Sequence, residues 1–143
     1  MGVIDTSDAN RLVVPDAKGN RRLDSLRNVL DRGRVGLLFL IPGLDETLRV
    51  NGRACLTRDP AVLERHVTAG KTPGVAVGVE VEEAFLHCAK AFRRSSLWEP
   101  EAWPSLEGLA RPAEIWRDHM ALPDFTTEAI EDYLEDDYTN NLY

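Results

Sequence analysis

The stretch VGLLFLIPGLDETLRVNGRACL, residues 35–56, decides the fold class of this protein. Its first seven residues, 35–41, form a continuous apolar run, which is short for a helix and typical of a strand buried on both faces. After a turn that contains Pro42 and Gly43, residues 46–56 alternate between apolar and polar side chains, which is the period of a β-strand. The two segments therefore predict a β-hairpin with a tight turn between its strands.

Two further strands are predicted on either side of this hairpin. Residues 11–15 (RLVVP) are rich in β-branched side chains and are followed by a turn sequence, DAKG, at 16–19. Residues 73–84 carry valine at every second position from Val75 to Val81, which is again the period of a strand. The sequence thus predicts four strands.

Helices are predicted between and after these strands. Residues 20–33 place apolar side chains three and four positions apart, which predicts a helix of about three turns with Asn20 as its N-cap and Gly33 as its C-terminal stop. Asp59-Pro60 opens a second predicted helix at 61–68. Further helical segments are predicted at 87–95 (a short helix or turn), 113–121 and 126–138.

This order of elements favours a small antiparallel barrel with inserted helices, in the α+β class, over a doubly wound sheet, because no glycine-rich turn links a strand to a helix. Four strands do not close a barrel alone, so we expect strands from a partner subunit or a missing part of the usual domain. We predict one domain over residues 1–143. In it, 11–98 form the barrel core and 99–143 form a Pro-rich connection and an acidic helical tail.

The formal net charge of −7 comes from the C-terminal end of the chain. Residues 124–143 hold seven acids and no lysine or arginine, so the acids and bases of the remaining residues cancel. A balanced body argues against nucleic acid as a partner, because a phosphate backbone needs clustered positive charge.

Composition and cysteine usage indicate an ordinary globular protein. Hydrophobic residues make up 43%, and no apolar run approaches the roughly 18 residues of a membrane helix. Residues 1–10 are polar and lack a signal pattern, which predicts a cytoplasmic location. Cys55 and Cys88 have no CxxC spacing and no histidine partner, which predicts two reduced structural thiols rather than a disulfide or zinc site, and no metal.

Several runs resemble the pyridoxamine 5'-phosphate oxidase superfamily. They are GNRRLDSLRN at 19–28, RVGLLF at 34–39 and ETLRVNG at 46–52. More narrowly, the chain is similar to an uncharacterised FMN-dependent branch of that superfamily, because HCAKA at 87–91 is followed by RS and LW within 94–98. The order of the four runs makes the resemblance fairly specific.

The resemblance covers residues 11–98 and implies a split β-barrel that forms a tight homodimer, with one FMN in each of two clefts at the subunit interface. It places Arg21 and Arg22 at the flavin phosphate, with Asn20 beside them. The residues read alone agree, since two guanidiniums and the free N–H groups of a helix start form an anion site. The alternative is that both arginines are ordinary solvated charges.

The resemblance also places Glu46, Thr47 and Arg49 near the isoalloxazine edge and the ribityl chain of the flavin. Thr47 stands where true pyridoxamine phosphate oxidases use a glutamine, so its hydrogen bonding to the ring must differ. The alternative for Arg49 is an ion pair with Glu46 or Asp45. Contacts from the other subunit are expected from Lys90, Arg94 and Trp98. The alternatives for these three are a surface helix face and aromatic packing.

The chain departs from the family in one large respect. Relatives have a longer segment before the strand at 11–15, with an early barrel hairpin and a further basic phosphate contact, whereas residues 1–10 alone precede it here. We therefore expect a fragment, a mis-assigned start or a naturally reduced barrel.

The function that the resemblance implies is an FMN-dependent oxidoreductase. It would transfer hydride between a substrate and a flavin nitrogen, with the protein supplying orientation and electrostatics. No side chain is a convincing acid or base, so the catalytic residues and the small-molecule substrate stay unknown. Pyridoxamine 5'-phosphate is not favoured, because no residues match those that hold its phosphate.

Two other functions stay open. One is a non-catalytic flavin-binding or dimerisation module. The other is a deazaflavin or haem protein on the same barrel, for which His87 is the only candidate iron ligand. A hydrogen-bonded structural role is the simpler interpretation of His87.

Overall fold

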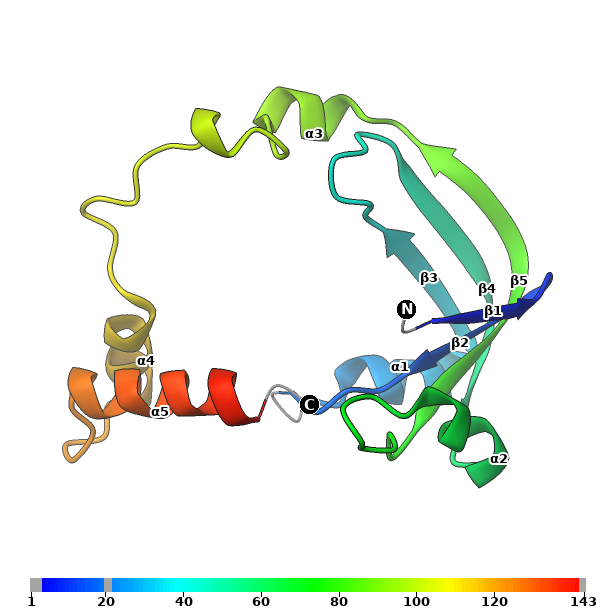
Figure 1. Ribbon diagram of the computed structural model, residues 1–143, viewed down its shortest axis with the longest axis horizontal. Coiled ribbons are helices and arrows are strands. Elements are labelled where there is room, and N and C mark those ends of the chain that lie inside the picture. The colour runs from blue at the N-terminus through cyan, green and yellow to red at the C-terminus, as the bar shows by residue number, and fades with distance from the viewer. Residues whose placement is uncertain (1–3, 20–21, 142–143) are drawn as a thin grey trace. The chain divides into compact units, whose positions relative to one another are not determined.

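The computed structural model describes residues 4–19 and 22–141. The chain divides into two compact units, Met1–Trp103 and Pro104–Tyr143. The first holds a β-sheet with short helices, and the second holds a pair of helices (Figure 1). Across the described ranges, no helix combines the length and the apolar character needed to cross a bilayer. The single domain that the sequence predicts stays a prediction.

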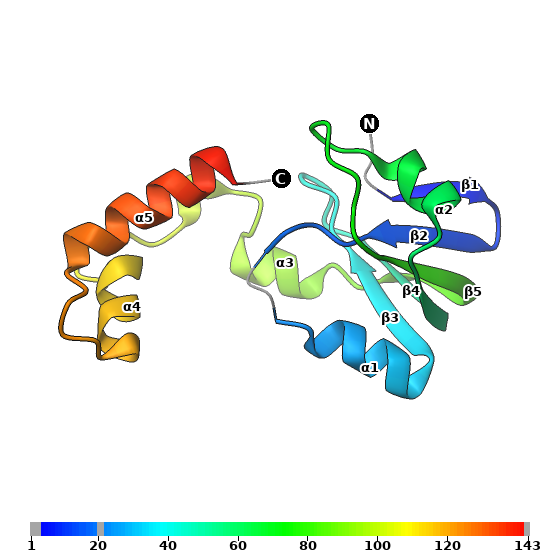
Figure 2. The same cartoon turned by 90° about the horizontal axis from the view of Figure 1, so that it is seen from below.

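The first unit is built on one five-stranded sheet with the strand order β1-β2-β5-β4-β3, and all neighbouring strands are antiparallel (Figure 2). The strands are β1 (Asp5–Asp8), β2 (Arg11–Pro15), β3 (Arg34–Phe39), β4 (Thr47–Thr57) and β5 (Ala76–His87). The predicted α+β class is confirmed, and all four predicted strands are present. β1 is additional, because its polar sequence has no alternation and it forms by pairing with β2.

A β-bulge interrupts the pairing of the two long strands, β4 and β5. Their register shifts between Asn51 and Gly52, which leaves Glu82 without a Cα partner on β4. Gly52 is required there, because a Cβ atom would lie 2.1 Å from the carbonyl oxygen of Glu80. Bulges bend strands, and Figure 1 shows β4 and β5 curving together.

Helix α1 (Asp24–Arg32) begins later than the sequence predicts. Its N-cap position is Leu23 and not Asn20, which lies outside the described residues. Leu23 has no side-chain oxygen, and Asp24 instead supplies the negative charge that a first helical turn favours. The end of the helix is as predicted, with Gly33 in the left-handed region at a φ of 62°.

Helix α2 (Pro60–Leu63) begins as predicted, since the Asp59 side chain accepts a hydrogen bond from the Ala61 N–H at 2.9 Å. It is one turn long and continues as the 3₁₀ helix η1 (Glu64–His66), so it is shorter than expected. Two more short helices follow β5, namely α3 (Lys90–Ser95) and the 3₁₀ helix η2 (Pro100–Ala102). The helix or turn predicted from His87 starts late because His87 belongs to β5.

A single copy of the first unit encloses little of its apolar surface. Val29 of α1, Val50 of β4 and Val79 of β5 are buried, but no large side chain in the described ranges is completely so. Helix α1 contacts only β3 and β4 among the strands in a substantial way. Large apolar side chains stay exposed elsewhere, with Leu86 at 72% and Leu30 at 68%. We call the sheet half open, because a single copy leaves much of its apolar surface exposed to solvent.

The second unit is a pair of helices, α4 (Pro112–Met120) and α5 (Thr127–Asn140), close to the predicted positions. The Thr126 side chain caps α5 by accepting a hydrogen bond from the Ala129 N–H at 3.2 Å. The small core of the pair consists of Ala113, Ile130 and Leu134, with Met120 packed against them.

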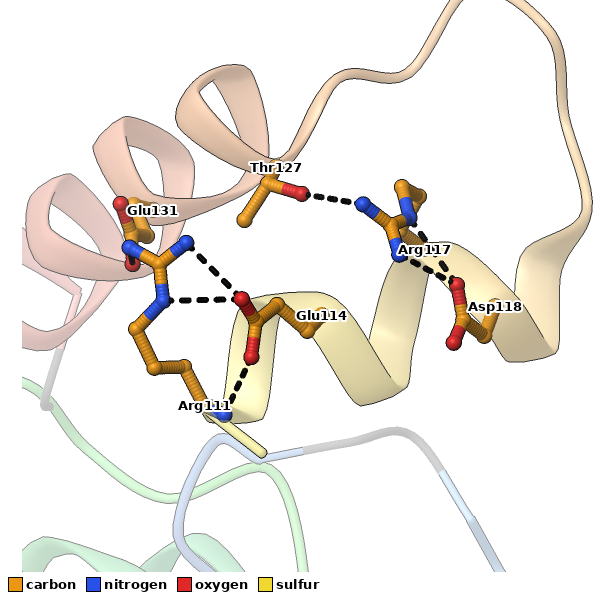
Figure 3. Close-up of polar contacts among 6 residues, drawn as sticks. All are labelled: Arg111, Glu114, Arg117, Asp118, Thr127 and Glu131. Atoms are coloured by element: carbon orange, nitrogen blue, oxygen red, sulfur yellow. Dashed lines mark hydrogen bonds and ion pairs between the residues drawn. The ribbon is translucent and has the colours of Figure 1, made fainter. Parts of the chain in front are cut away.

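Polar contacts also join α4 to α5 (Figure 3). Arg111, at the start of α4, pairs with Glu114 at 3.0 Å and with Glu131 of α5 at 2.8 Å. Arg117 donates a hydrogen bond to the Thr127 hydroxyl at 2.9 Å. Because the ion pairs are exposed, each contributes little to stability, and the apolar core holds the pair together.

Candidate functional site

Side chains from three strands share one face of the sheet where β4 begins and β5 ends. This site face consists of Leu38, Thr47, Arg49, Phe85 and His87. Arg49 is the Cα partner of both Leu38 and Phe85, and Thr47 is the partner of His87. Antiparallel partners and every second residue of a strand lie on the same side, so these residues share one side of the sheet.

Arg49 is the residue of the site face that has an unsatisfied hydrogen-bond donor. Its side chain is half-buried, and its Nε is buried without a hydrogen-bond partner in the described part of the chain. The alternative ion pair with Asp45 does not form, because Asp45 pairs with Arg93 at 3.0 Å. A buried donor without an acceptor costs about 1–3 kcal/mol, so Arg49 carries a penalty that an added acceptor would remove. His66 Nε2 is the other buried side-chain atom without a partner in the described residues, and it lies outside the site face.

The two other predicted contacts near the start of β4 are less accessible to solvent. Thr47 is only 3% exposed, and Glu46 is half-buried. The loop before them, residues 41–46, is held by α3 and the segment that follows it. Trp98 Nε1 donates to the Leu44 carbonyl oxygen at 3.0 Å, and the Trp98 ring stacks on Phe92 with centroids 6.2 Å apart.

The ion pair between Arg93 and Asp45 and the hydrogen bond from Trp98 to Leu44 together hold the loop, and we call them the clamp. Trp98 therefore has a structural role. Its indole N–H is engaged with the loop, and its ring lies against Phe92. The predicted contact between Trp98 and flavin stays a prediction. What the geometry adds is that Trp98 fixes the loop from which Thr47 and β4 start.

Lys90 and Arg94 lie on α3, immediately after β5 ends. Both are exposed, and because they are four positions apart they lie on the same side of the helix. The sheet register and the clamp thus bring Glu46, Thr47 and Arg49 to the same end of the sheet as α3. This end of the sheet and α3 with the segment after it carry six of the nine predicted cofactor contacts, namely Glu46, Thr47, Arg49, Lys90, Arg94 and Trp98. The prediction takes the last three from the other subunit, and a single copy does not test it.

Of the three predicted phosphate contacts, only Arg22 lies in the described residues, and it lies elsewhere. Asn20 and Arg21 lie outside the described residues, and Arg22 is exposed, with its Nε 3.6 Å from an Asp24 carboxylate oxygen. Arg22 leads into α1, which adjoins the start of β3, whereas α3 follows the end of β5. Figure 1 shows α1 and α3 toward opposite ends of the sheet. One copy therefore does not bring the two groups together.

A hollow of about 390 Å³ opens on another part of the sheet, over β2, β4 and β5. Its lining includes Gly78 and Cys55, and two other lining residues, Arg53 and Glu80, form an ion pair at 2.8 Å. It contains none of the predicted contacts. Cys55 and Cys88 are both free and exposed, and no group of three or more His, Cys, Asp or Glu in the described ranges could hold a metal ion.

A family model described as pyridoxamine 5'-phosphate oxidase matches residues 1–88, more than half of the chain. This chain belongs to the pyridoxamine 5'-phosphate oxidase family. The matched residues include Arg22 and the whole site face and end before Lys90, Arg94 and Trp98. The match thus covers the residues on which the predicted phosphate and ring contacts lie.

Solved structures give weaker likenesses. The 1.70 Å crystal structure of Group A Streptococcus HupZ is 16% identical, with a TM-score of 0.48, and the match covers 59% of this chain and 68% of that one. A histidine-to-alanine variant of HupZ, solved at 1.98 Å, is 18% identical, with a TM-score of 0.47, and the match covers 59% and 73%. No curated protein sequence matches the chain.

Sequence reasoning missed Phe85 as a member of the site, and it did not place His87 on the sheet. The cause is the bulge. Valine occupies odd positions from Val75 to Val81, but after Glu82 the side of the sheet that carries those valines continues with Ala84 and Leu86, at even positions. An apolar alternation that is allowed to move once from odd to even positions, as a bulge requires, predicts β5 up to His87.

Proposed function

We propose that this member of the pyridoxamine 5'-phosphate oxidase family binds FMN as a homodimer and uses it to oxidise or reduce a small molecule. Family membership supports the choice of cofactor. The observation that carries the proposal is the buried, unpartnered Nε of Arg49 on the site face. A flavin ring has carbonyl oxygens at its edge, which are the acceptors that this donor lacks.

The remaining residues fit the other parts of FMN. A phosphate suits Arg21 and Arg22, since guanidiniums grip phosphate oxygens at two points and α1 starts close by. Thr47 begins the strand that carries Arg49, and Glu46 precedes it in the loop. When bound, the flavin supplies hydride transfer, and the protein supplies orientation and the electrostatic setting of the ring. We assign no catalytic side chain.

Two copies are proposed because one copy is incomplete in two ways. The predicted phosphate contacts and the α3 contacts stand apart within one chain, as Figure 1 shows for α1 and α3. The sheet is also half open, and Leu38 and Phe85 of the site face are 48% and 39% exposed. A second copy that covers the site face would bury this apolar surface and bring Lys90, Arg94 or Arg22 to the same flavin.

The test is an FMN titration of the full chain, followed by flavin fluorescence and visible absorbance. Arg49→Met removes the donor, and Arg58→Met is the matched control, because Arg58 is exposed and lies in the turn after β4. We expect Arg49→Met to weaken FMN binding about tenfold or more, the size of a lost hydrogen bond to a charged group, with Arg58→Met unchanged. A wild-type chain that binds no FMN would refute the proposal.

A second measurement separates the oxidoreductase from the non-catalytic module. FMN-loaded protein is mixed anaerobically with NADH or NADPH, and loss of the visible flavin bands is followed against free FMN. Reduction faster than that of free FMN would support an enzyme. Tight binding without faster reduction by these donors would favour a flavin-binding module.

A further inference from the structure

We propose that His87 is an additional ligand-binding residue that hydrogen-bonds to the ring portion of the flavin. This inference rests on the proposed function, because it concerns the same site. It goes further in assigning the ring edge to a residue whose simplest sequence interpretation is structural. Four observations carry it: the strand register, the stacking of His87 on Phe85, the exposure of His87, and its place between the start of β4 and α3.

The register puts His87 beside the residues that await a ligand. His87 is the Cα partner of Thr47, and two residues earlier Phe85 is the partner of Arg49. The His87 ring stacks on the Phe85 ring, with centroids 6.3 Å apart and planes at 25°. The stacked rings of His87 and Phe85 thus lie on the face of the sheet that also carries Thr47 and Arg49.

The structural interpretation of His87 finds no support in its surroundings. His87 is exposed, and in the described ranges it is engaged in stacking rather than in a hydrogen bond. The chain has three histidines, and the other two are placed differently. His66 is half-buried in η1, and His119 is on α4 in the second unit. Of the three histidines, only His87 lies on the site face.

His87 also lies between the predicted contacts at the start of β4 and those on α3. It is the last residue of β5, so one side of it is the Thr47 and Arg49 strand, and the other is the start of α3 at Lys90. A neutral imidazole offers one donor and one acceptor. A flat heteroaromatic ring with alternating donors and acceptors at its edge matches that pair, while Arg49 Nε takes a carbonyl oxygen.

The experiment compares FMN with riboflavin, which has the same ring and no phosphate. Both are titrated into the wild-type full chain, His87→Ala, His87→Gln and Arg22→Ala, with His119→Ala as a control outside the site. His87 is exposed at a strand end, so its variants should fold, and far-UV circular dichroism checks this.

We expect His87→Ala to weaken FMN and riboflavin equally, by about fivefold to tenfold, and to shift the visible bands of the bound flavin. His87→Gln, which keeps a donor and an acceptor, should recover much of the loss. Arg22→Ala should weaken FMN more than riboflavin, because it acts on the phosphate.

Two results would overturn the inference in different ways. If the wild-type chain binds FMN but His87→Ala leaves both affinities and the spectrum unchanged, His87 does not touch the ring, and the proposed function stands. If the wild-type chain binds neither FMN nor riboflavin, the proposed function fails, and the role of His87 fails with it.

Discussion

Gly52 and Arg49 show how single positions on β4 meet opposite demands. Gly52 is buried by a close backbone approach that leaves no room for a side chain, and it serves the fold. Arg49 keeps a buried donor without an acceptor, which costs stability in the empty protein. A residue that costs stability without a ligand is a mark of a binding site.

Replacing Gly52 by alanine should destabilise the protein by about 1–3 kcal/mol or more, because the new methyl group would meet the Glu80 carbonyl oxygen at 2.1 Å. Urea denaturation gives the free energy of unfolding. Gly74→Ala is the control, since nothing lies within 4 Å of a Cβ there. Equal stability of the two variants would show that the bulge is not tightly packed.

Arg49→Met should have opposite effects on stability and on binding. Without flavin, we expect the free energy of unfolding to stay level or rise by up to about 1 kcal/mol, since an unsatisfied buried donor is removed. FMN affinity should fall at the same time. Thermal unfolding with and without FMN measures both. A variant that is less stable and binds FMN normally would show that Arg49 serves the fold.

Among the elements, the loop at 41–46 and α3 form a linked pair. The ion pair between Arg93 and Asp45 and the hydrogen bond from Trp98 to Leu44 hold the loop from which β4 starts. The order of the loop therefore depends on residues more than 40 positions away in the sequence, a dependence that local patterns do not reveal.

Trp98→Phe should loosen this loop while keeping the aromatic stack on Phe92. The lost hydrogen bond to Leu44 is worth about 1 kcal/mol, so amide hydrogen exchange in residues 41–46 should speed up about fivefold. Trp116→Phe is the control, because Trp116 lies in the second unit and is 48% exposed. Unchanged exchange in Trp98→Phe would mean that the loop is held by other contacts.

Carboxylates at the helix starts give the second unit a predicted response to acid. Hydrogen bonds from the Arg111 backbone N–H and then from its side chain lower the pKa of Glu114. The pKa of Glu128 is lowered by its own backbone N–H and by the Thr126 side chain. A lowered folded-state pKa adds stability at neutral pH, which is lost as pH falls through that pKa, below about pH 5.

We therefore expect the α4–α5 pair to lose helical signal at a lower temperature as the pH is reduced from 7 toward 3. The effect should be small, because both carboxylates are exposed. Glu114→Gln should show a weaker pH dependence than the wild type, as measured by circular dichroism. An identical dependence in the variant would assign the effect to other carboxylates.

The sequence predicts the elements well where the spacing of apolar residues agrees with the turn and capping residues at their ends. The pairing of β3 with β4, the stop at Gly33 and the Asp59 cap are confirmed by local geometry. The tight turn predicted between the two strands is wrong, because β3 ends at Phe39 and the longer loop 40–46 leads to β4. Prediction from sequence fails where the backbone departs from a regular period. The bulge at Gly52 hid the end of β5, and α1 started after Asn20 because no local signal fixed where its first turn begins.

At the scale of the whole molecule, the central feature is that one copy leaves its site face open. Leu38 of β3 is the Cα partner of Arg49 of β4, and it is 48% exposed although it lies in the most apolar run of the chain. The complete site could not be predicted from sequence patterns, because these patterns do not show which surface a second copy would cover. The proposed dimer comes from the family resemblance, because no local sequence pattern indicates it.

Leu38→Asp should therefore weaken the dimer and FMN binding together. A carboxylate buried at the interface without a partner costs several kcal/mol, so we expect a shift to monomer at micromolar concentration. Light scattering coupled to size exclusion gives the mass. Leu106→Asp is the control, because Leu106 is 75% exposed in the second unit. A wild-type chain that is monomeric at high concentration, with FMN bound, would refute the two-copy site.

The half-open sheet also bears on how this protein is made in a cell. If the proposed dimer forms, a newly synthesised copy exposes Leu38, Phe85 and the edge of β5 beyond its pairing with β2 until it meets another copy. The yield of folded protein should then depend on the rate of synthesis: too slow, and single copies are degraded before they meet; too fast, and their open edges pair wrongly. The level of expression thus becomes a determinant of folding.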